Sequence, residues 1–255
     1  MDQLIRSGVP VDGLGDKLAT PLLFALLANN PVGVEALLKR GADPNHRIDG
    51  QGLVGGFPII LYLAGTERGN ALLELMLKYG ANPDTRYPPS LNDAPEKRYE
   101  GDSLLIRSVM SLQDVKTIVK YGADINWQPH DESTTSTGGA PAVVEAAGLG
   151  QFAVVEYLVE HGARDLDAVA HTLQARAWTE QSLSRRLKIL AMVRARGGKI
   201  YSGYKPVLRN EITLYQPNGT PADWISPGFY RPEANASEKP VVISDWWLKR
   251  AGLER

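Results

Sequence analysis

One glycine pattern in the chain has the residue types of a phosphate-binding loop: Gly50, Gly52 and Gly55 match G-x-G-x-x-G. In a dinucleotide site this pattern follows a strand and opens a helix, so that backbone N–H groups cradle a pyrophosphate. Here no strand of a βαβ unit precedes the pattern, which falls in a loop between two predicted helices. We therefore expect a flexible loop that binds no nucleotide.

The residues that could perform acid–base or metal chemistry are scattered. The four histidines are His46, His130, His161 and His171, and no pair has the i, i+4 spacing of a helical metal site. No G-x-S-x-G nucleophile elbow occurs. His161 precedes Gly162 at the end of a predicted helix, where the helix dipole favours a cation, so we expect a structural role for it. We predict no catalytic residue, no metal and no cofactor.

A short phrase that ends in a turn recurs along the chain. Its copies are ALLKRGADPN at residues 36–45, LMLKYGANPD at 75–84, TIVKYGADIN at 117–126 and YLVEHGARD at 157–165. In each copy an apolar run meets a glycine, which favours the left-handed conformation that ends a helix. The Asp and Asn residues that follow can bond to nearby backbone groups and hold a turn. Recurrence every few tens of residues indicates stacked supersecondary units.

A second recurring piece lies upstream of these runs and predicts the first helix of each unit. It reads TPLLFA at residues 20–25, FPIIL at 57–61, DSLLI at 102–106 and APAVV at 140–144. Proline suits the first helical position, because its fixed φ is already helical and its missing donor is not needed there. Each unit is therefore predicted to be a helix, a short turn and a second helix that ends at glycine.

These residues resemble the ankyrin repeat, whose first helix opens T-P-L-H-x-A and whose second is followed by a Gly-Ala-Asp-like turn. The resemblance implies an all-α ankyrin-repeat solenoid of stacked helix-turn-helix pairs, with hairpin-like fingers and an irregular C-terminal cap. It covers residues 1–198, as a half repeat at 1–14, repeats at about 15–47, 48–86, 87–128 and 129–165, and a divergent repeat at 166–198. The family's histidine is replaced by apolar residues, at Leu23, Ile60, Leu105 and Val143.

Loop lengths between the units point to a binding surface. The chain takes 13 residues from the turn glycine Gly8 to the next helix opening at Pro21. The corresponding steps are 17 residues for Gly41 to Pro58, 23 for Gly80 to Ser103 and 19 for Gly122 to Pro141. These three longer loops are called fingers below. Insertions in solenoids fall in loops on one face, often the binding face.

The fingers are rich in aromatic, Arg and acidic side chains, and aromatic residues and Arg are the usual anchors of protein interfaces. We predict that a protein partner contacts Arg47, Asp49, Arg86, Tyr87, Asp93, Lys97, Arg98, Tyr99, Trp127, His130 and Asp131. The alternative is that the fingers are solvated loops of drifted length, since insertions cost little free energy.

The repetition stops after Gly198, and residues 199–255 form an extension rich in aromatic residues and proline. Frequent proline rules out long helices, whereas the aromatic residues argue against disorder. A final helix is predicted within DWWLKRAGL, residues 245–253. We expect the extension to pack on the last repeat and cap its apolar end. The alternative is a second binding surface.

Composition limits the classes of partner. The chain has 28 Lys and Arg against 29 Asp and Glu, a net charge of -1, which gives no general attraction to nucleic acid. It has no cysteine, and no stretch approaches the roughly 20 apolar residues that span a bilayer. We expect a soluble protein, monomeric when unbound and with no membrane insertion. The cytoplasm is favoured, and the periplasm fits if an N-terminal signal has been removed.

The resemblance implies a non-catalytic module that binds a protein through its concave face and fingers. A chain with divergent repeats and a C-terminal extension outside the repeat pattern looks like bacterial ankyrin proteins. Some of these are immunity proteins that neutralise a cognate toxin. A bacterial effector that binds a host protein is an alternative. The competing class is an enzyme with a site in the extension, built for example from Glu211, Asp223 and Tyr230.

Overall fold

The computed structural model of the chain describes residues 10–13, 20–50, 52–65, 69–95, 100–129, 139–175, 180–200 and 245–253. The chain divides into two compact units, residues 1–139 and 140–255, which are treated separately below as unit 1 and unit 2. The division falls inside the expected repeat 129–165, and the repeat boundaries stay predictions.

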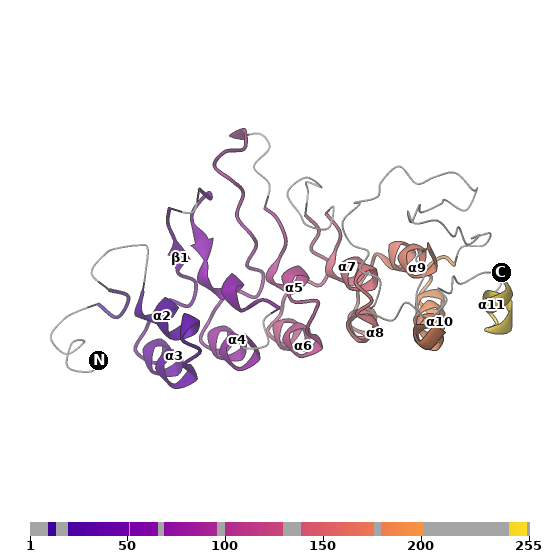
Figure 1. Ribbon diagram of the computed structural model, residues 1–255, viewed down its shortest axis with the longest axis horizontal. Coiled ribbons are helices and arrows are strands. Elements are labelled where there is room, and N and C mark those ends of the chain that lie inside the picture. The colour runs from indigo at the N-terminus through magenta and orange to yellow at the C-terminus, as the bar shows by residue number, and fades with distance from the viewer. Residues whose placement is uncertain are drawn as a thin grey trace. The chain divides into compact units, whose positions relative to one another are not determined.

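Unit 1 is built from pairs of short helices (Figure 1). The pairs are α2 (Pro21–Leu27) with α3 (Pro31–Leu38), the 3₁₀-helix η1 (Ile59–Leu63) with α4 (Gly69–Lys78), and α5 (Leu104–Arg107) with α6 (Leu112–Lys120). We call α2, η1 and α5 the inner row and α3, α4 and α6 the outer row. The first two fingers rise from the inner row, and the first contains the antiparallel strands β1 (Arg47–Ile48) and β2 (Phe57–Pro58).

Unit 2 is also built from packed helices. Its helices are α7 (Ala142–Gly148), α8 (Phe152–Glu160), α9 (Leu166–Ala175), α10 (Glu180–Ala195) and α11 (Asp245–Arg250). α7 packs on α8 and α9, and α10 packs on α8 and α9. α11 is the predicted final helix, and the guanidinium of Arg194 on α10 donates to the carbonyl of Gly252 just after it, at 2.9 Å. The predicted all-α fold is confirmed.

Side-chain hydroxyl groups cap the first helices of two pairs. Thr20 and Ser103 are the N-caps of α2 and α5, and each hydroxyl accepts the backbone N–H three residues further on, at 3.2 and 3.3 Å. Pro21 occupies the first helical position, as predicted. The same prediction is wrong for Pro58 and Pro141, which are N-caps with ψ of 125° and 160°. Proline restricts φ but leaves ψ free to stay extended.

The turn glycines end the outer helices as predicted. Their φ values are +89° at Gly41, +95° at Gly80, +94° at Gly122 and +97° at Gly162. A Cβ at any of these positions would meet no atom within 4 Å, so the backbone conformation alone selects glycine. The predicted local bonds are also present, since a side-chain oxygen accepts the N–H two residues further on at Asp43, Asn82 and Asp124.

The same turns are bonded to each other, which local sequence reasoning did not predict. The side-chain oxygen of Asn45 accepts the N–H of Asn82 at 2.8 Å, and its amide nitrogen donates to the carbonyl of Gly80 at 2.9 Å. The carboxylate of Asp84 accepts the N–H of Asp124 at 2.7 Å. These bonds form a ladder of side chains that joins one turn of unit 1 to the next.

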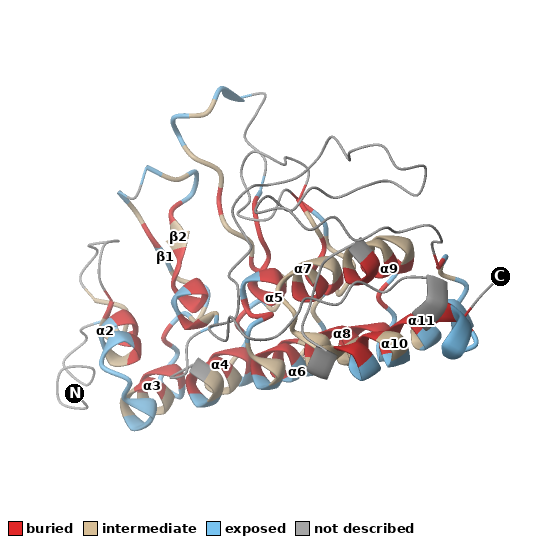
Figure 2. Ribbon diagram, turned by 45° about the vertical axis from the view of Figure 1, so that its right-hand side comes forward, coloured by how far each residue is buried: buried red, intermediate tan, exposed pale blue. Residues whose placement is uncertain are grey.

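The apolar core lies between the rows of helices. Buried residues occupy the helix faces turned toward neighbouring helices, whereas exposed residues line the outer side of α3, α4 and α6 (Figure 2). The four positions at which the family has histidine are buried, with Leu23 6% exposed and Ile60, Leu105 and Val143 each 1% exposed. Apolar packing therefore replaces a hydrogen-bonded side chain at these positions.

We expect Asn45→Ala to lower the free energy of unfolding of unit 1 by about 1–2 kcal/mol, because it removes two bonds of about 1 kcal/mol each. Urea denaturation measures the change. Asn45→Asp keeps the acceptor but loses the donor, and should lose about half as much. The control is Asn92→Ala in the second finger, which should change the value by less than about 0.5 kcal/mol. A loss no larger than this control would show that the ladder does not stabilise the stack.

We also expect unit 2 to lose stability in mild acid because of His171 on α9. Burial lowers the pKa of His171 below its ordinary value. As pH falls through about 6.5, the unfolded chain takes up a proton that the folded chain still resists, so acid favours unfolding. Thermal unfolding between pH 7.5 and 5.5 should show this loss, and His171→Gln should reduce it. His161→Gln, at an exposed helix end, is the control that should keep it. An unchanged pH dependence in His171→Gln would contradict the assignment.

Candidate protein-binding surface

The first finger is a short hairpin that places Phe57 and Arg47 on opposite faces. Ile48 pairs with Phe57, and Arg47 pairs with Pro58. Directly paired residues share a face of an antiparallel pair, and neighbours along a strand alternate. The Nε of Arg47 donates to the carbonyl of Gly55 at 2.7 Å, so this predicted contact residue also holds the hairpin loop closed.

The first and second fingers are joined to each other near their tips. Leu53 and Ser90 form an antiparallel bridge between them. On either side of it, the N–H of Val54 donates to the carbonyl of Pro89 at 2.9 Å, and the N–H of Leu91 donates to that of Gly52 at 2.7 Å. The two fingers are therefore one backbone-bonded surface. Loop lengths alone had not indicated this connection.

The base of the second finger is fixed to the start of α5. Arg86 and Ser103 form an antiparallel bridge. The N–H of Tyr87 donates to the carbonyl of Asp102, and the N–H of Gly101 donates to that of Tyr87, both at 2.9 Å. Because successive residues of an extended chain point to opposite sides, Arg86 and Tyr87 contact different neighbours.

Tyr87 belongs to a cluster that spans both fingers and the inner row. The ring centroids of Phe57 and Tyr62 lie 4.8 Å apart, and those of Phe57 and Tyr87 lie 5.8 Å apart in an edge-to-face arrangement. The guanidinium carbon of Arg107 lies 5.4 Å from the centroid of the Tyr87 ring. Both kinds of contact are favourable. We call Phe57, Tyr62, Tyr87 and Arg107 the aromatic–arginine cluster.

Arg86 links the second finger to the start of the third. Its guanidinium carbon lies 3.5 Å from the centroid of the Trp127 ring. Its Nη1 donates to the carboxylate of Glu100 at 2.7 Å. Two predicted contact residues, Arg86 and Trp127, are thus brought together and stack on each other.

The remaining predicted contact residues divide into two groups. Asp49 and Asp93 are half-buried, in the first and second fingers. Lys97, Arg98, Tyr99, His130 and Asp131 lie outside the described residues, as do Glu211, Asp223 and Tyr230 of the competing enzyme hypothesis.

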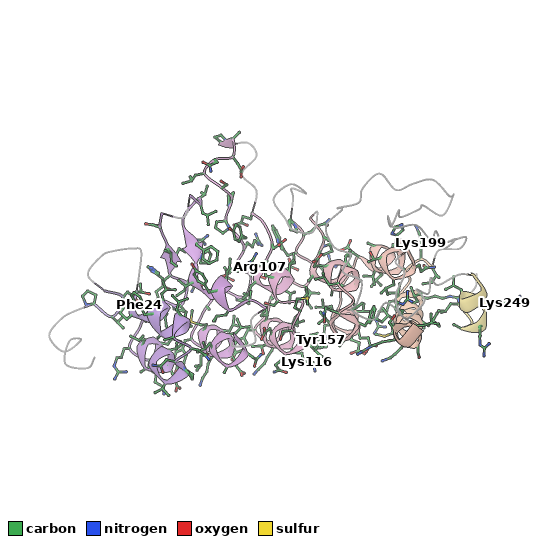
Figure 3. The ribbon with its side chains drawn as sticks, in the orientation of Figure 1. Phe24, Arg107, Lys116, Tyr157, Lys199 and Lys249 are labelled. Atoms are coloured by element: carbon green, nitrogen blue, oxygen red, sulfur yellow. The ribbon has the colours of Figure 1, made fainter. Side chains whose placement is uncertain are left out.

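Exposed side chains of the inner row were missed by the sequence reasoning. Phe24, Tyr62 and Arg107 each lie four residues after the N-cap of their helix, and all are exposed. Figure 3 labels Phe24 and Arg107 on this row, whereas Lys116 lies on α6 in the outer row. Leu27, at the end of α2, and Met110, in the turn after α5, each lie seven residues after an N-cap and are also exposed. Aligning the helix starts would have revealed this row, because helical residues at equal offsets share a face.

The described residues that could bind a metal ion are dispersed, and the glycine pattern is part of a finger. Among these residues no three His, Cys, Asp or Glu side chains are grouped to hold a metal ion. The glycine pattern lies in the loop of the first finger, where Gly50, Gly52 and Gly55 have φ of +84°, +66° and +68°. Within the described ranges, no helix combines the length and apolarity needed to cross a bilayer.

Gly56 provides a test of how the hairpin supports the cluster. Its φ is +74°, and a Cβ there would lie 2.8 Å from the carbonyl oxygen of Ile48. Gly56→Ala must therefore displace the backbone next to Phe57. We expect it to cost about 1–3 kcal/mol of folding free energy and to alter the near-ultraviolet circular dichroism of the packed aromatic rings.

The matched control for this prediction is Gly52→Ala. Gly52 also has a positive φ, +66°, but a Cβ there would meet nothing within 4 Å. Gly52→Ala should lower the free energy of unfolding only by the cost of a left-handed backbone at alanine, about 1–2 kcal/mol. It should leave the near-ultraviolet circular dichroism unchanged. Equal spectra for the two variants would contradict the proposed support.

Comparison with known proteins places the fold. A family model described as the ankyrin repeat matches residues 17–49. An ankyrin repeat domain from Acinetobacter baumannii is 22% identical, with a TM-score of 0.53, over 77% of this chain and 93% of that one. The ankyrin repeat domain of human ASB11 is 15% identical, with a TM-score of 0.46, over 71% of each chain. No curated protein sequence matches the chain.

The matched repeat coincides with α2 and α3, and the paired helices, left-handed turn glycines and fingers recur beyond it. The chain therefore contains an ankyrin repeat and has the ankyrin-repeat fold.

Proposed function

We propose that this protein is a non-catalytic binding module that holds a protein partner on the finger side of unit 1. The surface meant here, the finger-side surface, consists of Phe24, Leu27, Tyr62, Arg107 and Met110 together with the two joined fingers. Ankyrin repeats generally mediate protein–protein interaction, and solenoids use such extended surfaces to do so. The aromatic–arginine cluster is the observation that carries the proposal.

Exposure of apolar side chains supports this surface. Phe24 is 62% exposed, Leu27 56%, Tyr62 41% and Met110 57%. Exposed apolar residues that share one face are more informative than single ones, because monomeric proteins rarely leave large apolar patches in water. Tyr and Arg are also the side chains most enriched where binding energy is concentrated.

The order of the fingers before any partner binds is a second argument for this binding surface. The first two fingers bond to each other through their backbones, and Phe57 packs against both Tyr62 and Tyr87. A surface ordered before binding loses less conformational entropy when a partner arrives. These contacts favour a binding surface over the alternative of fingers that are merely solvated loops.

Two narrower roles follow from the same mode of binding. An immunity protein would neutralise a cognate toxin by covering the toxin's active site with the fingers, and an effector would bind a host protein in the same way. The resemblance to bacterial ankyrin proteins supports these roles by analogy only. If the partner is a toxin, adding the protein should suppress the toxin's activity in proportion to the complex formed.

The proposal is tested by capturing the partner with the full chain and titrating the purified partner by calorimetry. Tyr62→Ala should weaken binding at least about tenfold, because it removes an aromatic anchor. Lys116→Ala in the outer row (Figure 3) is the control and should bind like the parent chain. Circular dichroism verifies that both variants are folded. Equal affinities for the two variants would place the partner elsewhere on the protein.

A further inference from the structure

We propose that Arg107 is a carboxylate receptor, so that the partner presents an Asp or Glu side chain flanked by an apolar one. This inference rests on the proposed function, because it assigns a chemistry to the partner of the finger-side surface. It concerns a single exposed guanidinium, the apolar side chains beside it, and the absence of a paired carboxylate among the residues that the structure describes.

The position of Arg107 distinguishes it from its equivalents. Phe24 and Tyr62 occupy the same offset from the N-cap and are aromatic, whereas Arg107 places a positive charge in this row. The guanidinium carbon of Arg107 lies over the Tyr87 ring, 5.4 Å from its centroid, which is within the range of a cation–π contact. A guanidinium held against an aromatic ring keeps its N–H edges available for a carboxylate, which it can bind through two parallel hydrogen bonds.

The described part of this chain supplies no carboxylate to Arg107. The ion pairs found among these residues, with nitrogen–oxygen distances within 4 Å, all have a Lys or Arg other than Arg107 as their cation. Arg86, in the second finger, differs from Arg107 in this respect. Its Nη1 lies 2.7 Å from the carboxylate of Glu100, and Trp127 stacks on its guanidinium. Within the described residues, Arg86 is therefore paired with a carboxylate, whereas Arg107 is exposed in the apolar row without one.

The apolar residues next to Arg107 indicate a second feature of the partner. Met110 follows Arg107 by three residues and is 57% exposed, while Tyr62 is part of the same cluster. A partner that brings a carboxylate to Arg107 therefore also places its adjacent side chain on apolar surface, and an aliphatic or aromatic residue gains most by burial there. Phosphate groups are recognised by several Arg residues together, and the aromatic–arginine cluster has one.

The test uses a displayed library of random peptides, selected for binding to the full chain. Enriched sequences should share an Asp or Glu next to an aliphatic or aromatic residue. The best peptide is then synthesised and titrated by fluorescence anisotropy. Arg107→Gln should weaken its binding roughly tenfold, whereas Lys116→Gln, which removes one positive charge from the outer row, should not.

A double-mutant cycle makes the assignment specific. Changing the acidic residue of the peptide to its amide should weaken binding to the parent chain but add little to the loss already caused by Arg107→Gln. Additive losses overturn the inference, as do enriched peptides that lack an acidic residue. A third peptide carries phosphoserine in place of the acidic residue. If it binds the parent chain more than about tenfold tighter than the acidic peptide does, and Arg107→Gln removes that gain, the inference is overturned in favour of a phosphate receptor.

The Tyr62→Ala variant separates this inference from the proposed function. If Tyr62→Ala weakens the peptide but the cycle at Arg107 shows no coupling, the finger-side surface binds the peptide and only the carboxylate assignment is wrong. If neither Tyr62→Ala nor Arg107→Gln affects the peptide, it binds outside the finger-side surface, and both proposals are contradicted.

Discussion

Contact between neighbouring repeats is the constraint on which unit 1 depends, because a pair of short helices cannot bury its own apolar face. α4 packs on both α3 and α6, so its apolar residues are covered from two sides. Hydrophobic packing of this kind has no direction and does not by itself set the spacing of the repeats. The ladder of turn side chains, from Asn45 to Asn82 and from Asp84 to Asp124, supplies direction through bonds of defined length.

The spacing of the repeats in turn determines what the fingers can do. Successive fingers are close enough for Leu53 to pair with Ser90 and for Phe57 to reach Tyr87. Each finger alone is a short loop or hairpin, which is marginally stable in water. Joined through their backbones and rings, they present aromatic side chains in an ordered arrangement. The proposed binding surface is therefore a consequence of stacking, and its affinity depends on contacts far from the partner.

Charge is handled differently at Arg86 and at Arg107. Arg86 is paired with Glu100 and covered by Trp127, so its charge serves the contact between fingers. Arg107 rests on Tyr87 in a row of exposed apolar side chains. An exposed ion pair within the chain contributes little to stability, whereas a guanidinium left available among apolar side chains can distinguish between partners. The second arrangement is the one that the proposed carboxylate receptor uses.

The sequence by itself determined the parts of this protein that depend on neighbours along the chain. Thr20 and Ser103 cap helices, Gly80 adopts a left-handed turn, and the recurring phrase specifies stacked helix pairs, because each involves residues a few positions apart. Only the tertiary structure decided that Arg47 and Phe57 face opposite ways, that the first two fingers are bonded together, and that Tyr62 and Arg107 join one cluster. Such contacts depend on strand register and repeat spacing, which are set by packing between segments far apart in the sequence.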